Sequence, residues 1–198
     1  MTRQYRIQKV TGEPDWDKIE KAPIDQRLWR PCEAISAQLA YDESRLYVHL
    51  HAEEAQIRAE NSGVLDQPCQ DSCLEFFLSA AECDARYLNI ELNPNLCLYF
   101  GFGTGRVDRM RLLLPGGGKT LNACCEGTAT GWDVAYELPF KLLQLFFPDL
   151  SPSGKIRGNF YKCGDLTAQE HYLAWNRVDA GHPDFHLPAY FGELCFSD

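Results

Sequence analysis

Two segments, DSCLEFFLS (residues 71–79) and YLNIELN (residues 87–93), carry the pattern that decides the fold. Every second residue is large and apolar: Leu74, Phe76 and Leu78 in the first segment, and Leu88, Ile90 and Leu92 in the second. Successive side chains of a β-strand point to opposite faces of the sheet, so this alternation predicts two strands that each bury one face in a core.

The same alternation continues on both sides of these segments, at residues 46–50, 132–138, 159–161 and 192–196. Turn-forming residues separate the runs at 42–44, 93–95, 115–118, 127–131 and 151–154. One short helix is expected over residues 139–147, where Pro148 would end it. This spacing predicts an all-β fold, a two-sheet antiparallel β-sandwich of the immunoglobulin or jelly-roll kind, and one domain over residues 1–198.

The composition excludes several protein classes. The 198 residues are 45% hydrophobic and 24% charged, which is the balance of an ordinary folded domain. No run of about 18 apolar residues is present to cross a bilayer, so no membrane partner is expected. The formal charge of −9 disfavours nucleic acid, whose phosphates attract Lys and Arg, but it does not disfavour a neutral sugar.

The cysteines and the N-terminus bear on the compartment. Nine cysteines at irregular spacing, with no Cys-x-x-Cys pair, indicate mostly reduced residues that act as small core hydrophobes. The N-terminus lacks the apolar core of a secretion signal. Both features favour a cytoplasmic protein, with export as the alternative if the N-terminus was trimmed. The oligomeric state is not predicted.

The second face of the predicted strands is unusual because it combines carboxylates, amides, an Arg and aromatic rings. Its members are Glu75, Phe77, Tyr87, Asn89, Glu91, Arg157, Asn159 and Tyr161. If these strands are neighbours, the residues share one sheet surface. Carboxylate, amide and guanidinium groups form hydrogen bonds with sugar hydroxyls, and aromatic rings stack on the C–H face of a pyranose. Trp175, which precedes a loop rich in Pro and His, is a candidate stacking platform.

Other motifs are weaker. The segment GGGKT (116–120) lacks the first glycine of a phosphate-binding loop, since Leu113 stands there. Pro183 makes a metal-binding helix around His182 and His186 implausible, so we expect a loop packed on the sandwich. A metal at His49 and His51 and a glycosidase pair at Glu75 and Glu91 stay open as alternatives.

The ordered set of segments resembles the family 9 carbohydrate-binding modules, over nearly the whole chain. The matching segments are APID (22–25), Trp29, AYD (40–42), LYV (46–48), DSCLEFF (71–77), YLNIELN (87–93), WDVAYELP (132–139), RGNFY (157–161), FHLP (185–188) and FG (191–192). The resemblance implies a bacterial-type β-sandwich that binds sugar, often at a chain end, in polysaccharide catabolism, and that can carry Ca²⁺. In the founding modules, which accompany xylanases, the sugar ring lies between two tryptophans.

Carried over to this sequence, the resemblance places Glu75 at the carboxylate of the Asp-Ser-x-x-Glu motif and Trp175 at the C-terminal aromatic position. Asn89 and Glu91 lie in the next polar-faced strand. Cys69 stands where the founding pattern has a tryptophan before the Asp-Ser pair, so half of the aromatic sandwich is missing.

We therefore expect a non-catalytic carbohydrate-binding module. Its predicted ligand site comprises Glu75, Asn89, Glu91, Arg157, Asn159, Tyr161 and Trp175, and no catalytic residue is assigned. The alternatives are a glycoside-acting enzyme that uses Glu75 and Glu91, a haem-binding sandwich, and a sandwich that has lost sugar binding and binds protein partners. Met1 and Met110 are the only methionines that could serve as haem ligands.

Overall fold

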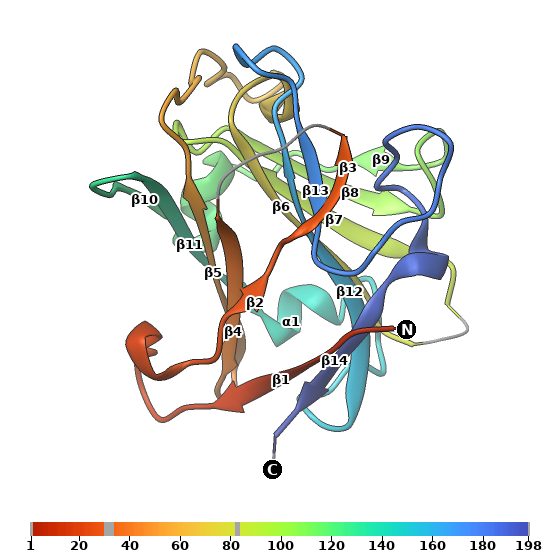
Figure 1. Ribbon diagram of the computed structural model, residues 1–198. Helices are drawn as coiled ribbons and strands as arrows, with labels where there is room; N and C mark the ends of the chain where they lie inside the picture. Colours follow the sequence, from red (N-terminus) through yellow and green to blue (C-terminus); the bar gives the residue numbers. More distant parts are fainter. Residues whose placement is uncertain (1, 30–33, 82–83, 198) are drawn as a thin grey trace.

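The computed structural model describes residues 2–29, 34–81 and 84–197, and nearly all of its regular structure is β-strand (Figure 1). The strands are β1 (Gln4–Lys9), β2 (Ala22–Pro23), β3 (Gln26–Trp29), β4 (Ile35–Tyr41), β5 (Arg45–Glu53), β6 (Cys73–Ser79), β7 (Tyr87–Leu92), β8 (Leu98–Gly103), β9 (Met110–Arg111), β10 (Cys124–Gly127), β11 (Gly131–Pro139), β12 (Lys155–Cys163), β13 (Tyr172–Ala174) and β14 (Gly192–Phe196). Short 3₁₀ turns span Trp16–Lys18, Pro68–Gln70, Gly117–Leu121 and Pro188–Tyr190.

The strands form one continuous sheet that curls into two facing halves. The order along it is β10-β11-β5-β4-β1-β14-β12-β6-β7-β8-β9. Strand β1 joins the halves, with β4 on one side and β14 on the other (Figure 1). The predicted all-β sandwich is therefore present in its broad form, as two packed layers.

The prediction of a purely antiparallel sandwich is wrong in one respect. Strand β1 runs parallel to both β14 and β4, whereas the other pairings among the described strands are antiparallel. Alternation of apolar residues is the same for both orientations, so it does not reveal the direction of a neighbour. The fold is a mixed sheet.

Local chemistry explains the turns. In the connection from β4 to β5, the Asp42 carboxylate accepts the backbone N–H groups of Ser44 (2.6 Å) and Arg45 (3.0 Å). This is the local hydrogen bonding that favours Asp in tight turns. Between β7 and β8, the Asn93 side chain accepts the backbone N–H of Cys97 at 2.9 Å.

The predicted helix is shorter than expected. Helix α1 spans Phe140–Leu143 and lies between the two halves (Figure 1). Its two buried side chains, Phe140 and Leu143, belong to the hydrophobic core. Tighter backbone bonds, such as Leu145 N–H to Leu142 C=O at 3.1 Å, end the helix before Pro148. No helix in the described part of the chain is long and apolar enough to cross a membrane.

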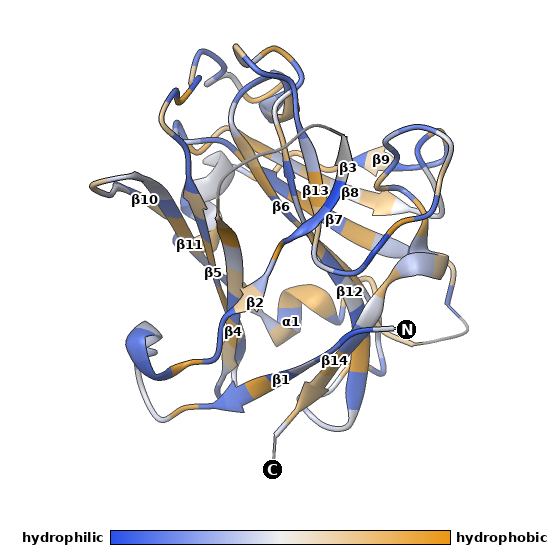
Figure 2. Cartoon of the chain, viewed as in Figure 1, coloured by the Kyte–Doolittle hydropathy of each residue, from blue (hydrophilic) through white to orange (hydrophobic). Residues whose placement is uncertain are grey.

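Two apolar clusters lie on the two faces of β6, β7 and β12, and hydrophobic and hydrophilic residues alternate along these strands (Figure 2). The larger cluster fills the space between the halves. The smaller one lies on the outer face and includes Phe77, Tyr87 and Tyr161, covered by Phe185 and Phe191 from the C-terminal segment 164–191. The outer face of this half is thus buried under a segment of the chain, and a functional site can form where that cover is incomplete.

Candidate functional site

The strand register brings the predicted polar face together. Glu75 of β6 pairs with Glu91 of β7 on one side and with Tyr161 of β12 on the other. Two residues along, Phe77 pairs with Asn89 and Asn159. Directly opposite side chains in a sheet point to the same face. The residues proposed to share a surface do so, although much of that surface is covered.

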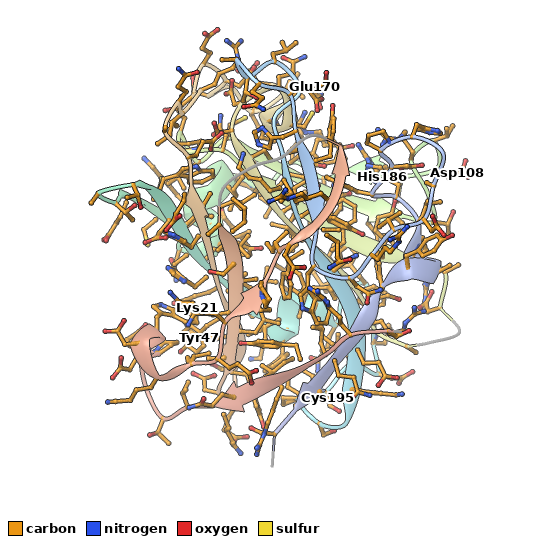
Figure 3. The ribbon with its side chains drawn as sticks, in the orientation of Figure 1. Lys21, Tyr47, Asp108, Glu170, His186 and Cys195 are labelled. Atoms are coloured by element: carbon orange, nitrogen blue, oxygen red, sulfur yellow. The ribbon has the colours of Figure 1, made fainter. Side chains whose placement is uncertain are left out.

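A cavity of about 430 Å³ opens at the Glu75 end of this face. Its lining residues are Cys69, Glu75, Glu91, Arg106, Arg109, Cys163, Asp165, Glu170, Tyr172, His182, Pro183, Phe185 and His186. Two of them are labelled in Figure 3: Glu170, in the loop before β13, and His186, in the segment before β14. The volume lies within the range of small-molecule sites.

Glu75 forms the floor of the cavity. Its carboxylate accepts the thiol of Cys163 at a sulfur–oxygen distance of 2.9 Å. No ion pair joins it to a described Lys, Arg or His. Burial raises the pKa of Glu75 well above its ordinary value, and the nearby charge of Glu91 raises it further.

Glu91 lies beside it and is held by Asn89, whose side-chain amide donates to Glu91 Oε1 at 2.6 Å. Burial raises the pKa of Glu91 to about 7, and Arg109 and Arg111 oppose that rise. The position of Asn89 depends on Gly101, because a Cβ there would lie 2.1 Å from Asn89 Oδ1. Asn89 is buried and does not line the cavity, so its contribution is to orient Glu91 from beneath.

Arg109 supplies the positive wall. Its guanidinium lies over the Tyr99 ring at 4.7 Å and donates to the Tyr99 hydroxyl at 3.0 Å. It also donates to the imidazole of His186, which lies 2.8 Å from the Tyr87 hydroxyl. Burial and the charges of Arg109 and Arg106 lower the pKa of His186 to about 3, so its imidazole is neutral.

A third wall comes from the loop that joins β12 to β13. The Tyr172 hydroxyl lies 3.0 Å from Asp165 Oδ1 and 2.9 Å from Glu170 Oε1, so the two carboxylates share its single proton. The Phe185 ring packs edge-on against Tyr172 at 6.1 Å and stacks on Tyr161 at 4.1 Å. This wall offers carboxylates beside a small aromatic surface.

Three predicted ligand residues instead hold the covering segment. The Arg157 guanidinium donates to the Phe191 carbonyl at 2.9 Å, and the Asn159 amide donates to the Asn176 carbonyl at 2.9 Å. The Tyr161 hydroxyl donates to the Phe185 carbonyl at 3.2 Å. None of these three side chains lines the cavity.

Trp175 requires a correction. It was expected to be a loop-borne platform, but its backbone N–H bonds to the Phe160 carbonyl at 2.9 Å, which continues the pairing of β13. The side chain therefore points to the main core, where it packs edge-on against Phe160 at 5.6 Å and is 2% exposed. Gly192 lies so close that a Cβ there would be 2.3 Å from the indole. As folded, Trp175 offers no face to a ligand.

The cavity also uses residues that the sequence did not single out, chiefly Arg109, Asp165 and Tyr172. Asp165 comes from a loop, Arg109 from a position just before the two-residue strand β9, and Tyr172 begins the three-residue strand β13, so no periodicity marks a face at any of them. His182 and His186 lie in a loop packed on the sheet, as predicted, and both line the cavity. In the sequence, these two histidines are marked by lying four residues apart in a segment that also holds Pro183 and Phe185.

One cluster of side chains in the described residues could hold a metal ion. Among them, the one group of three or more His, Cys, Asp or Glu side chains with clustered ligand atoms is Cys73, Glu75 and Cys163. Calcium prefers six to eight oxygen ligands, and two thiols do not fit it. His51 bonds to Asp133 at 2.5 Å and His49 to Gln38 at 3.0 Å, so both have protein partners.

Comparisons with known proteins agree on one family. A family model described as "Carbohydrate-binding family 9" matches residues 10–196. A presumed carbohydrate-binding protein from Bacteroides uniformis has a similar structure, with TM-score 0.82 and 27% identity over 100% of both chains. No curated protein matches the chain.

A family 9 module from Caldicellulosiruptor kristjanssonii is similar over 98% of this chain at 14% identity. Its complex with glucose gives TM-score 0.67 over 96% of that chain, and its complex with cellotriose gives 0.65 over 93%. At this identity the likeness is one of fold.

Proposed function

Because the chain belongs to carbohydrate-binding family 9, we propose that the cavity above Glu75 and Glu91 binds a sugar and that the domain is a non-catalytic module. The observation that carries the proposal is the pair of buried carboxylates that share one cavity without a described ion-pair partner. A carboxylate accepts up to four hydrogen bonds, and sugar hydroxyls are donors of the right size and density.

The other walls complement a sugar in the same way. Arg109 donates hydrogen bonds to hydroxyl or ring oxygens, while Asp165 and Glu170 accept from hydroxyls on the opposite side. Tyr172 and Phe185 supply the apolar surface that the C–H face of a pyranose requires. The cavity has polar groups on several sides and only one small aromatic patch. We therefore expect the sugar ring to be held mainly by hydrogen bonds.

Glucose and cellotriose are the first ligands to test, because the Caldicellulosiruptor module has been solved with both. The position of the missing tryptophan, Cys69, lies in the cavity lining. With less stacking, we expect a dissociation constant of roughly 10 µM to 1 mM. The proposed setting is polysaccharide breakdown, which is the setting of the modules that the chain resembles.

Calorimetric titration with glucose, cellotriose and a panel of other short glycans tests the proposal, with and without added Ca²⁺. Glu91→Gln keeps the size of the side chain but removes its charge, and we expect it to weaken binding about tenfold or more, which is about 1.4 kcal/mol. Glu193→Gln is the matched control, because Glu193 lies on β14 and bonds to Lys155 away from the cavity.

Saturable binding that Glu91→Gln weakens and Glu193→Gln leaves unchanged supports the site. Binding of equal strength in both variants moves the sugar to another surface. If folded wild-type protein binds none of the glycans, the proposal falls, and a protein-interaction role becomes the better hypothesis.

One observation favours a second candidate, a glycoside-acting enzyme. Glu75 and Glu91 are direct cross-strand neighbours, so both carboxyl groups reach the same cavity, and burial raises the pKa of each. Retaining glycosidases hold their two carboxyl groups about 5–5.5 Å apart, with one carboxyl protonated by a raised pKa. Release of nitrophenol from chromogenic glycosides, abolished by Glu75→Gln, would establish this activity, and its absence would leave binding alone.

A further inference from the structure

Two cysteines and a glutamate meet beneath the cavity. Cys73 and Cys163 are directly opposite on β6 and β12, and Glu75 follows Cys73 by two residues on the same face. The two sulfur atoms and a carboxylate oxygen all lie within 4.8 Å of one another, and all three residues are buried. Each position is set by strand register, so the cluster is held by the sheet itself.

The donor set and its spacing match a soft divalent metal. Zinc binds thiolate sulfur at about 2.3 Å and carboxylate oxygen at about 2.0–2.2 Å in tetrahedral geometry, which puts its ligand atoms about 3.5–3.8 Å apart. The three ligand atoms of the cluster lie within 4.8 Å of one another, which is close to that spacing. Two thiolates select zinc-like metals over calcium or magnesium.

The charges nearby also favour a cation. Neither Glu75 nor Glu91 has a described ion-pair partner. Lys162 is adjacent in sequence, but it points to the other face of β12, where it bonds to Glu54. Arg109 lies across the cavity beside His186. The floor therefore gathers acidic groups with no described cation in contact.

We propose that Cys73, Glu75 and Cys163 bind a thiophilic divalent metal ion, Zn²⁺ first, with the fourth tetrahedral position facing the cavity. Cys163 and Glu75 line the cavity, whereas Cys73 lies behind them. Three protein ligands and one open position is the arrangement of zinc sites that contact solvent or ligand. This metal site is a separate property from sugar binding, because its three ligands are side chains of the protein and no sugar is needed to form it.

Titration of reduced, metal-free protein with Co²⁺ tests the site, because thiolate-bound cobalt gives a charge-transfer absorption that oxygen-bound cobalt lacks. We expect one Co²⁺ per chain, displaced by Zn²⁺. The variants Cys73→Ser and Cys163→Ser should each lower the affinity at least tenfold. Cys97→Ser is the matched control, since Cys97 is also buried and free but bonds to the Gly63 carbonyl elsewhere.

The absorption overturns the proposal if it persists in the double variant Cys73→Ser, Cys163→Ser, because other thiols such as Cys124 then bind the metal. Its absence from wild-type protein does so as well. If the serine variants do not fold, X-ray absorption of zinc-loaded wild-type protein decides: two sulfur neighbours with lighter atoms support the site, and no sulfur or four sulfurs contradicts it.

Sugar titrations of metal-free and zinc-loaded protein keep the two proposals separate. Zinc binding without sugar binding leaves the metal site standing and removes the proposed function. If the protein binds sugar but binds neither zinc nor cobalt, the proposed function stands and the metal site is removed.

Discussion

Lys162 and Cys163 are consecutive residues of β12, and they point to opposite faces with different chemistry. Lys162 is fully buried on the core side, where its ammonium donates to Glu54 at 3.3 Å and to His171 at 2.8 Å. Glu54 also accepts the Ser72 hydroxyl at 2.8 Å. Every charged group in this cluster has a partner.

Cys163 points the other way, to the cavity floor. There Glu75 and Glu91 lie side by side on neighbouring strands, bonded to a thiol and an amide. The carboxylates of Asp165 and Glu170 share one hydroxyl, that of Tyr172. In the described part of the chain, none of the four carboxylates forms an ion pair.

The contrast separates a structural polar cluster from a binding site. Glu54 accepts the indole N–H of Trp132 at 3.0 Å, so the core-side cluster links β12 in one half to β11 in the other. A buried charge that is fully paired serves to fix packing. Buried carboxyl groups without an ion-pair partner have raised pKa values, and such groups are typical of functional sites. Substitutions on the two sides should therefore change different properties.

The largest expected effect is on the core side. Lys162→Met keeps the length of the side chain and removes its charge, which leaves Glu54 buried without its cation. Loss of one partner of a buried ion pair costs about 3–5 kcal/mol, so urea unfolding should show a drop of that size. Lys155→Met is the control on the same strand, because Lys155 is exposed and its ion pair with Glu193 is at the surface.

Sugar affinity of any Lys162→Met protein that remains folded should equal that of wild type. An unfolding free energy unchanged from wild type would mean that the cluster does not join the two halves.

The second largest effect is expected at Trp175, on the core side of the sheet. Trp175→Phe shortens a core side chain, and we expect a loss of about 2–3 kcal/mol of unfolding free energy, somewhat less than for truncation to Ala. Its sugar affinity should stay within about twofold of wild type, a difference of about 0.4 kcal/mol. Tyr172→Phe, on the cavity side, should do the opposite by weakening binding with little change in stability. Selective loss of binding in Trp175→Phe would restore Trp175 as the platform.

The difference between these two aromatic residues shows how far the sequence could be read. Alternation located β6, β7 and β11 and the polar face around Glu75, because side-chain direction in a strand is a local property. Trp175 was misplaced because the end of β13 is not marked locally, and one more residue of pairing turns the ring inward.

The rest of the site depends on contacts that are distant in sequence. Arg109 and His186 are 77 residues apart and meet only because two loops close over the same sheet face. The parallel pairing of β1 with β14 likewise joins the two ends of the chain. No periodicity encodes such contacts, so the cavity walls could not be predicted, although its floor could.

Acid titration tests the cavity side through His186. Its pKa is about 3 in the folded protein against an ordinary value of 6.5, because burial and then Arg109 and Arg106 disfavour the proton, while Asp184 favours it. The unfolded chain takes up a proton first, so the stability that neutral His186 contributes is present above pH 6.5 and is lost as the pH falls towards 3. Between pH 7 and pH 5 the contribution of His186 falls by about 2 kcal/mol, whereas Glu91, whose pKa is raised to about 7, adds stability over the same range.

Urea unfolding across this range should show wild type losing stability relative to His186→Gln, because the Glu75 and Glu91 effects are common to both proteins. The Gln side chain is not protonated in this range but retains hydrogen-bonding groups for Arg109 and Tyr87. His182→Gln is the control, because His182 lies four residues away in the same loop and is exposed. Identical pH profiles for wild type and His186→Gln would show that His186 is not buried beside Arg109 in solution.

The smallest expected effect is a gain of binding on the cavity side. Cys69 is half-buried in the cavity lining, and its carbonyl accepts the Asp165 N–H at 3.0 Å, a backbone bond that any side chain retains. Cys69→Trp adds an aromatic ring, and an aromatic contact contributes about 1 kcal/mol, so glucose affinity should rise about fivefold. Cys69→Ser, which adds no ring, should leave the affinity near that of wild type.

Calorimetry on both variants decides whether the sugar lies against Cys69. A gain in the tryptophan variant alone places the sugar there, and weaker binding in that variant means that the ring fills space that the sugar needs. Either change should leave the unfolding free energy nearly constant, because the cavity, unlike the Lys162 cluster, takes no part in joining the two halves of the sheet.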